Sequence, residues 1–369
     1  MLQIDDDRLS REVYVTRNLL ESGNREFIKR EYDSFILLNG SLFLNFPRKD
    51  YDLSDLKFRQ QISHSLKRLD RNAFWDYMYF MASNKDLLID IGDNVIKLAN
   101  EIKYKNIPYF DACKKYNEKQ FVDIILSYYA TYGNKIYSIV KKFFDEKRIN
   151  MKSIPLPGNA GYYSHFVWLN SGYIFSKYSD YGGSSLANVV HELGHAIDAE
   201  LFLFPQQKKN QLFNDMFVEI PSISFETGFY DYLQDINIDR LGGKILANNR
   251  ATNLFYTFEE IYWALGDENL MVYEDGKAKD SKGYGYELRK DLLYGLGSIF
   301  AYHLNEIRKN STEDFLKILN NLATSRKEMS LEEAINMAGF DLEEFVSCSN
   351  IKTHLNENCL TLKKRYNLL

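Results

Sequence analysis

Two histidines and a glutamate near the middle of the chain have the types and spacing that metal chemistry requires. His191, Glu192 and His195 form a His-Glu-x-x-His sequence, so on a helix both imidazoles lie on one face about one turn apart. Such a pair can bind one metal ion, and the carboxylate of Glu192 can take a proton from a water held there and pass it to a leaving amine. The chain has only 6 histidines, so chance occurrence of this pattern is on the order of one per cent. We therefore predict a catalytic site with one zinc ion.

A catalytic zinc ion needs a third protein ligand and one open position for water. The metzincin spacing would require Gly and His at the positions held by Asp198 and Leu201. The next predicted helix carries Glu219 and Glu226, seven residues apart and therefore on one helix face, in an otherwise apolar segment. One of these two glutamates should bind the metal, and the other should support it.

The elements that must position these residues are mainly helices. Apolar residues surround the His-Glu-x-x-His sequence at helical spacing and predict a helix over about residues 186–204, which Pro205 ends. The same pattern predicts helices over residues 211–233 and 287–308. It also predicts helices through most of residues 8–147.

A different pattern follows the Pro- and Gly-rich residues 154–159. Residues 161–169 are rich in aromatic and β-branched types, which favour strands. We therefore expect a mainly α-helical fold with a small antiparallel sheet near residues 160–175. We expect residues 1–150 to form a helical N-terminal half that is a wall or lid of a cleft, and residues 151–369 to form the catalytic half.

Composition excludes several other classes of protein. The 369 residues include 46 Lys and Arg against 51 Asp and Glu, so the net charge of -5 does not favour nucleic acid. No apolar stretch reaches membrane-spanning length, and the polar N-terminus does not resemble a signal peptide. Cys113, Cys348 and Cys359 have no Cys-x-x-Cys spacing, which fits a reducing compartment. We expect a cytoplasmic protein without a membrane or nucleic-acid partner. The sequence does not predict its oligomeric state.

Several motifs, in the same order, resemble those of the oligopeptidase family that includes oligoendopeptidase F and thimet oligopeptidase. The Gly161-Tyr162-Tyr163-Ser164 segment is similar to the family's substrate-binding turn, the His191 motif to its zinc helix, and Glu219-Ile220-Pro221-Ser222 to its third-ligand segment. The resemblance implies that Glu219 is the third metal ligand. It also implies that Glu226 is the outer carboxylate that orients a ligand histidine. The chain is shorter than typical members of the family.

A further segment, Leu293 to Ala301, is similar to the family's Tyr-x-x-Gly segment. The resemblance implies that Tyr294 donates a hydrogen bond to the oxyanion of the tetrahedral intermediate. The family often places a His and further tyrosines shortly before this segment, whereas this chain has Lys290 and Leu292 there. The nearby tyrosines that could substitute include Tyr286, and His165 adjoins the expected substrate strand. We therefore add both to Gly161, Tyr162 and Tyr163 as candidate substrate-binding residues.

These observations favour a zinc-dependent endopeptidase that hydrolyses short peptides, with the peptide added as a strand along residues 162–169. One alternative is a processing protease that matures a single defined peptide. Another is a peptide-binding protein that keeps the metal for structure, although such a protein would not need Glu192.

Overall fold

The computed structural model describes the middle of the chain and much of its C-terminal part. The described residues are 80–81, 83–101, 114–150, 161–166, 171–176, 183–203, 216–236, 238–266, 273–274, 277–278, 285–325 and 329–352. The predicted loops at residues 45–55 and 106–108 lie outside these ranges, as do Cys113 and Cys359.

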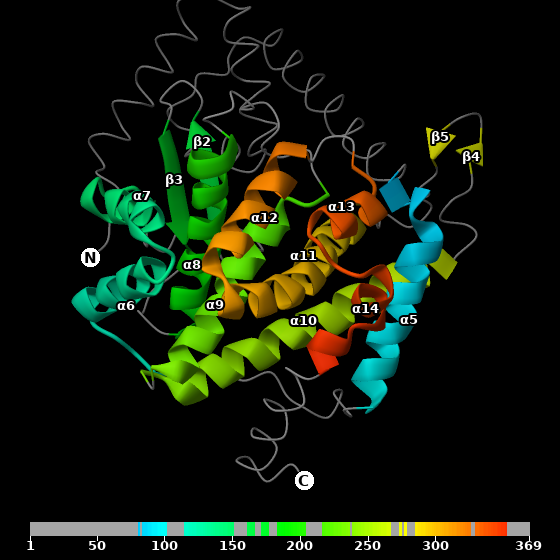
Figure 1. Cartoon of the computed structure of the whole chain (residues 1–369), viewed down its shortest axis with the longest axis horizontal. Coiled ribbons are helices and arrows are strands. Elements are labelled where there is room, and N and C mark those ends of the chain that lie inside the picture. The colour runs from blue at the N-terminus through cyan, green and yellow to red at the C-terminus, as the bar shows by residue number, and fades with distance from the viewer. Residues whose placement is uncertain are drawn as a thin grey trace, which may run out of the picture. The chain divides into compact units, whose positions relative to one another are not determined.

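Most of the described residues are helical, which confirms the predicted mainly α-helical class (Figure 1). The α-helices are α5 (Lys85–Glu101), α6 (Glu118–Ala130), α7 (Asn134–Asp145), α8 (Gly183–Ile197), α9 (Glu219–Asp235), α10 (Arg240–Gly266), α11 (Gly285–Asn310), α12 (Thr312–Ser325), α13 (Leu331–Met337) and α14 (Leu342–Ser347). The chain divides into two compact units.

The first unit contains α6, α7 and a small sheet. Helix α6 begins with a capping box, in which the Asn117 side chain accepts from the backbone N–H of Gln120 and the Gln120 side chain accepts from that of Asn117. Its apolar residues bury one face of the helix, as the helical spacing predicted. The Tyr129 hydroxyl donates to the carbonyl of Val190 at 2.8 Å, which ties α6 to α8.

The sheet has the strand order β1-β3-β2. Strand β2 (Gly161–Phe166) pairs antiparallel with β3 (Ser171–Ser176), and β1 (Ile149–Asn150) pairs with β3 in parallel. The register places Ser164 opposite Tyr173 and His165 opposite Gly172. A second pair, β4 (Tyr273–Glu274) and β5 (Lys277–Ala278), forms a short antiparallel ladder in the other unit.

The second unit is built around α9, α10 and α11, which pack on one another. Helix α5 packs on α10 and α14, and α12 packs on α11. Two long-range hydrogen bonds fasten α5 and the residue before it to the C-terminal helices: Asn94 Nδ2 donates to the Val346 carbonyl at 3.0 Å, and the Leu331 N–H donates to Asn84 Oδ1 at 3.0 Å. The unit therefore combines helices from both sides of residue 150, where the sequence predicted a division.

Two of the predicted helices carry the candidate site, and both have other limits than expected. Helix α8 begins at Gly183 rather than near residue 186, and it changes at Asp198 into a π-helical segment, Asp198–Leu203. Such segments occur often at functional sites. Helix α9 begins at Glu219 rather than at residue 211; the part of that prediction at residues 211–215 lies outside the described residues. Pro221 fits in the first turn because the N–H that proline lacks has no helical acceptor there.

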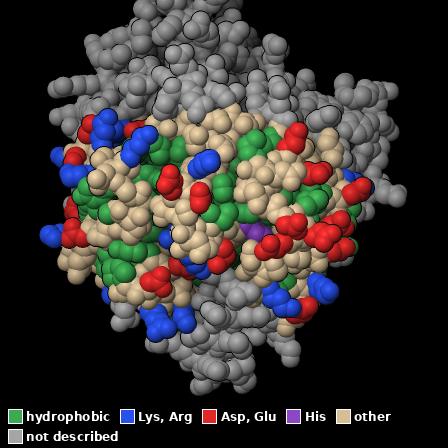
Figure 2. All heavy atoms as spheres, viewed as in Figure 1, with side chains coloured by type: hydrophobic (Ala, Val, Ile, Leu, Met, Phe, Trp, Pro, Cys, Tyr) green, Lys and Arg blue, Asp and Glu red, His purple; other side chains and the backbone are tan. Residues whose placement is uncertain are grey.

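The described surface carries charges of both signs. Figure 2 shows Lys and Arg side chains interspersed with Asp and Glu side chains on the face in view. Among the described helices, none is both long enough and apolar enough to span a membrane.

Candidate metal centre

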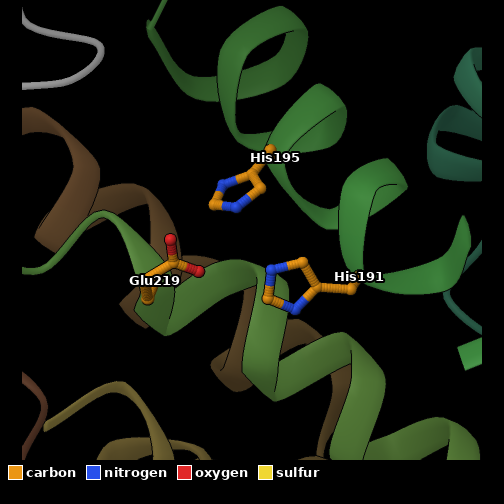
Figure 3. Close-up of side chains that lie close together, drawn as sticks. All are labelled: His191, His195 and Glu219. Atoms are coloured by element: carbon orange, nitrogen blue, oxygen red, sulfur yellow. The ribbon is translucent and has the colours of Figure 1, made fainter. Parts of the chain in front are cut away.

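Three residues predicted to be metal ligands lie together. His191 and His195 come from α8, and Glu219 is the first residue of α9. One potential ligand atom from each lies within 4.8 Å of the others, and Figure 3 shows the three side chains turned toward one another. The two imidazole centroids are 5.1 Å apart with their planes at 83°. His191 and Glu219 are buried and His195 is half-buried, so the group is largely shielded from bulk water.

The chemistry of this group fits a divalent metal ion. Two imidazoles and one carboxylate form a common ligand set of catalytic zinc sites, and it leaves a fourth position open. Ligand atoms about 2.1 Å from a tetrahedral ion lie about 3.4 Å apart. The ligand atoms of His191, His195 and Glu219 lie within 4.8 Å of one another, so small side-chain rotations would bring them to the spacing that one ion requires. A carboxylate as buried as Glu219 is also costly unless a cation or hydrogen bonds compensate it.

Ser222 supports the carboxylate of Glu219 one turn along α9. Its hydroxyl oxygen lies 2.9 Å from the carbonyl oxygen of Glu219 and 3.0 Å from its Oε2. A hydrogen bond to a ligand carboxylate restricts its rotation. Ser222 was not among the residues predicted from the sequence, although its i,i+3 spacing from Glu219 was a signal that could have identified it.

Glu226 lies two turns after Glu219 on α9 and is buried. Its carboxylate accepts hydrogen bonds from the hydroxyl of Tyr230 and from the guanidinium of Arg250 on α10. Burial lowers the pKa of Arg250, but the combined effect of the neighbouring Glu226, Tyr230 and Tyr294 is larger and in the opposite direction. The pKa of the guanidinium is therefore raised overall. The Arg250 side chain therefore stays cationic and pairs with the carboxylate of Glu226.

Sequence reasoning did not identify Arg250 or Tyr230. The available signal was a run of polar residues, Asn248, Asn249 and Arg250, in the middle of the long helix α10. All three are buried. A buried polar run within a helix indicates a network of hydrogen bonds or charges, since unpaired polar groups are costly there.

Tyr294, the candidate oxyanion donor, lies half-buried on α11 and close enough to Arg250 to influence its pKa. The cation of Arg250 thus connects the region around Tyr294 with that of Glu226. Tyr286 belongs to the first turn of α11, and its side chain lies outside the described part.

Among the substrate-binding candidates on β2, Tyr163 has a position other than expected. Its side chain is 3% exposed and its ring centroid lies 6.4 Å from that of Phe143. A Cβ atom added at Gly172 would lie 2.3 Å from the Tyr163 hydroxyl oxygen, so this glycine makes room for the phenol. Burial and the neighbouring Glu200 raise the pKa of Tyr163 well above its usual value. Tyr163 is therefore a core residue of the first unit, because its ring fills the space between β3 and α7.

The other candidates on this strand are Gly161, Tyr162 and His165. The structure describes their backbone positions but not their side chains, so their contact with a peptide remains a prediction. Asp198, to which the sequence analysis gave no role, is 2% exposed and lies near the Tyr163 phenol, whose pKa it raises.

Comparison with known proteins places this fold among peptidase structures. No protein-family model matches the chain, and no curated protein matches it by sequence. Three solved structures share its fold at low sequence identity. They are a protein from Bacillus anthracis str. Ames designated an oligoendopeptidase F (TM-score 0.53, 15% identity, 91% of this chain), a second protein designated an oligoendopeptidase F (TM-score 0.52, 11% identity, 90% of this chain, 74% of that one), and PZ peptidase A bound to an inhibitor (TM-score 0.51, 11% identity, 84% of this chain, 69% of that one).

The chain spans 64% of the length of the Bacillus anthracis structure. Its fold is therefore that of the oligoendopeptidase F structures, as the sequence motifs predicted, in a shorter chain.

Proposed function

We propose that this protein is a zinc-dependent endopeptidase that hydrolyses peptide bonds in short peptides. The proposal rests on the proximity of the His191, His195 and Glu219 side chains, together with the buried Glu192, which follows His191 in the same helix. The likeness in fold to structures named as peptidases supports the same reaction class. A glutamate directly after the first histidine is what catalysis needs and what a structural metal site does not need.

In the proposed reaction, His191, His195 and Glu219 would hold the zinc ion, which would supply a Lewis acid and lower the pKa of water. Glu192 accepts a proton from the attacking water and later delivers it to the leaving amine. Tyr294 donates a hydrogen bond from its phenol to the developing oxyanion. Glu226, which accepts hydrogen bonds from Arg250 and Tyr230, is the outer carboxylate that orients a ligand histidine.

We also propose that the peptide backbone binds along β2, near Tyr162 and His165. Main-chain hydrogen bonds to a strand supply affinity with little dependence on the peptide's side chains. This mode suits an enzyme that accepts many short sequences.

The deciding experiment measures cleavage of a mixed quenched-peptide library by the wild type and by Glu192→Gln, with bound metal quantified in each. We expect the wild type to carry about one zinc ion and to cleave. The variant should keep its zinc, because Glu192 is not a ligand. It should lose activity by about 10²–10⁴-fold, because it lacks the proton acceptor.

Two other results would contradict the proposal. A wild type that binds zinc but cleaves no library peptide contradicts the broad peptidase proposal, and peptide binding without turnover would then indicate a binding protein. A wild type that binds no divalent metal rules out the proposed centre altogether.

A further inference from the structure

Two glycines two residues apart on α11 face different neighbours. A Cβ atom built at Gly297 would lie 3.0 Å from the Cβ and 3.2 Å from the carbonyl carbon of Glu219, and 2.9 Å from Cδ1 of Ile223. A Cβ atom built at Gly295 would instead meet the Phe258 ring on α10 at 2.9 Å. Residues two positions apart point about 200° apart around a helix, which explains why the glycines serve different interfaces.

Gly297 therefore lies directly against the backbone of the residue that the metal centre uses as its third ligand. Two of its three closest approaches involve atoms of Glu219 near or in the main chain, which cannot rotate away. The third involves the end of the Ile223 side chain, which can. A methyl group at residue 297 would thus displace the start of α9 by a few tenths of an ångström.

The same helix carries Tyr294, one turn before Gly297. The depth at which α11 packs on α9 therefore determines both where Glu219 lies and how far it is from Tyr294. Metal affinity and oxyanion stabilisation both depend on ligand and donor positions to within about half an ångström.

We propose that Gly297 is a positioning residue of the metal centre, because its missing side chain lets α11 contact the Glu219 backbone and so fixes this ligand relative to His191 and His195. The inference rests on the metal site of the proposed function. It assigns Gly297 no contact with substrate or metal.

The test compares zinc dissociation constants of the wild type, Gly297→Ala and Gly295→Ala, measured by competition with a chromophoric chelator. Both variants add one methyl group to the same helix and both crowd a neighbour at 2.9 Å. We expect Gly297→Ala to weaken zinc binding about 10-fold or more, the scale seen when a group that supports a ligand is lost. Gly295→Ala should bind zinc within about twofold of the wild type, because Phe258 lies on α10 and belongs to no ligand-bearing helix.

A double variant, Gly297→Ala with Ile223→Val, separates positioning from crowding. The second change removes the Cδ1 atom nearest the new methyl group, so it should recover folding stability if the single variant folds poorly. Its zinc affinity should stay low, since the contacts with Glu219 persist.

Wild-type zinc affinity in Gly297→Ala, or affinity regained in the double variant, would overturn the proposal for Gly297. Equal weakening in Gly295→Ala would do the same, because general crowding would then explain the loss. These results differ from failure of the proposed function, which would appear as absence of zinc binding by the wild type itself.

Discussion

Ser222 and Ser224 provide a comparison at the residue scale, because both are fully buried serines of α9 with different acceptors. Ser222 lies within hydrogen-bond distance of Oε2 of Glu219, whereas Ser224 donates to the Ile220 carbonyl at 2.6 Å. Ser222→Ala should weaken zinc binding about 10-fold, because the ligand carboxylate gains rotational freedom. Ser224→Ala should leave zinc binding unchanged. Isothermal titration of both apoproteins with zinc measures the difference, and equal affinities would contradict a supporting role for Ser222.

The Arg250–Glu226 ion pair gives a second prediction at the same scale. Both side chains are more than nine-tenths buried, so Arg250→Met leaves a carboxylate without its cation. The free energy of unfolding should fall by about 3–5 kcal/mol, the usual cost of breaking a buried pair from one side.

Adding Glu226→Gln to Arg250→Met should recover part of this loss, because the remaining polar group is then neutral and can still accept from Tyr230. Urea unfolding of the two single variants and the double variant measures the coupling. Additive losses would show that the two side chains do not act as a pair.

At the scale of elements, the start of α6 depends on a few residues of its first turn. The Asn117 side chain accepts from the Gln120 N–H at 2.8 Å, whereas Lys119 forms an exposed pair with Asp123. Asn117→Ala should lower the free energy of unfolding by about 1 kcal/mol, because a helical N–H loses its acceptor. Lys119→Ala should cost less than about 0.5 kcal/mol. Urea unfolding followed by circular dichroism distinguishes the two, and similar losses would show that the cap adds nothing.

Helices α8 and α9 each carry proposed metal ligands close to one end of the helix. The π-helical segment begins three residues after His195, and α9 begins at its ligand without a side-chain cap. A carboxylate at the first turn of a helix interacts favourably with the helix dipole, which suits Glu219 at that position.

At the scale of the whole molecule, His303 links α11 to the C-terminal residues and makes stability depend on pH. Its ring stacks on Phe345 at 4.8 Å, and Asn350 Nδ2 lies 3.0 Å from its Nδ1. Burial lowers the pKa of His303 to about 4, although Glu306 acts in the opposite direction. The unfolded chain takes up this proton near pH 6.5 and the folded chain only near pH 4, so stability falls as the pH falls between these values.

Because of His303, we expect the free energy of unfolding to fall by about 1.6 kcal/mol between pH 6.5 and pH 5. His303→Gln keeps an acceptor for Asn350 but does not titrate, so it should lack this part of the pH dependence. Urea unfolding of both proteins across this range tests the prediction. Parallel pH profiles for wild type and variant would contradict it.

The sequence pattern alone was sufficient for the mainly helical class and for His191 and His195, whereas the choice of Glu219 over Glu226 came from the resemblance to the oligopeptidase family. The first two inferences depend on local spacing, such as the four-residue interval between His191 and His195, and such intervals determine which side chains share a helix face. Limits of elements were less predictable, because apolar residues can be buried in a turn as well as in a helix. Met216, Phe217 and Val218 are buried in a turn where the pattern indicated helix, and α9 begins after them at Glu219.

Only the tertiary structure decided which elements contact one another. Arg250 lies 24 residues from Glu226, and Gly297 lies far beyond Glu219 in the chain, so no sequence spacing relates either pair. The same holds for Tyr163, whose aromatic side chain suits either a peptide-binding strand or a core, and packing against Phe143 and Gly172 places it in the core. Side-chain types and short intervals are local properties of a sequence, whereas the depth of helix packing and the burial of a ring depend on the whole fold.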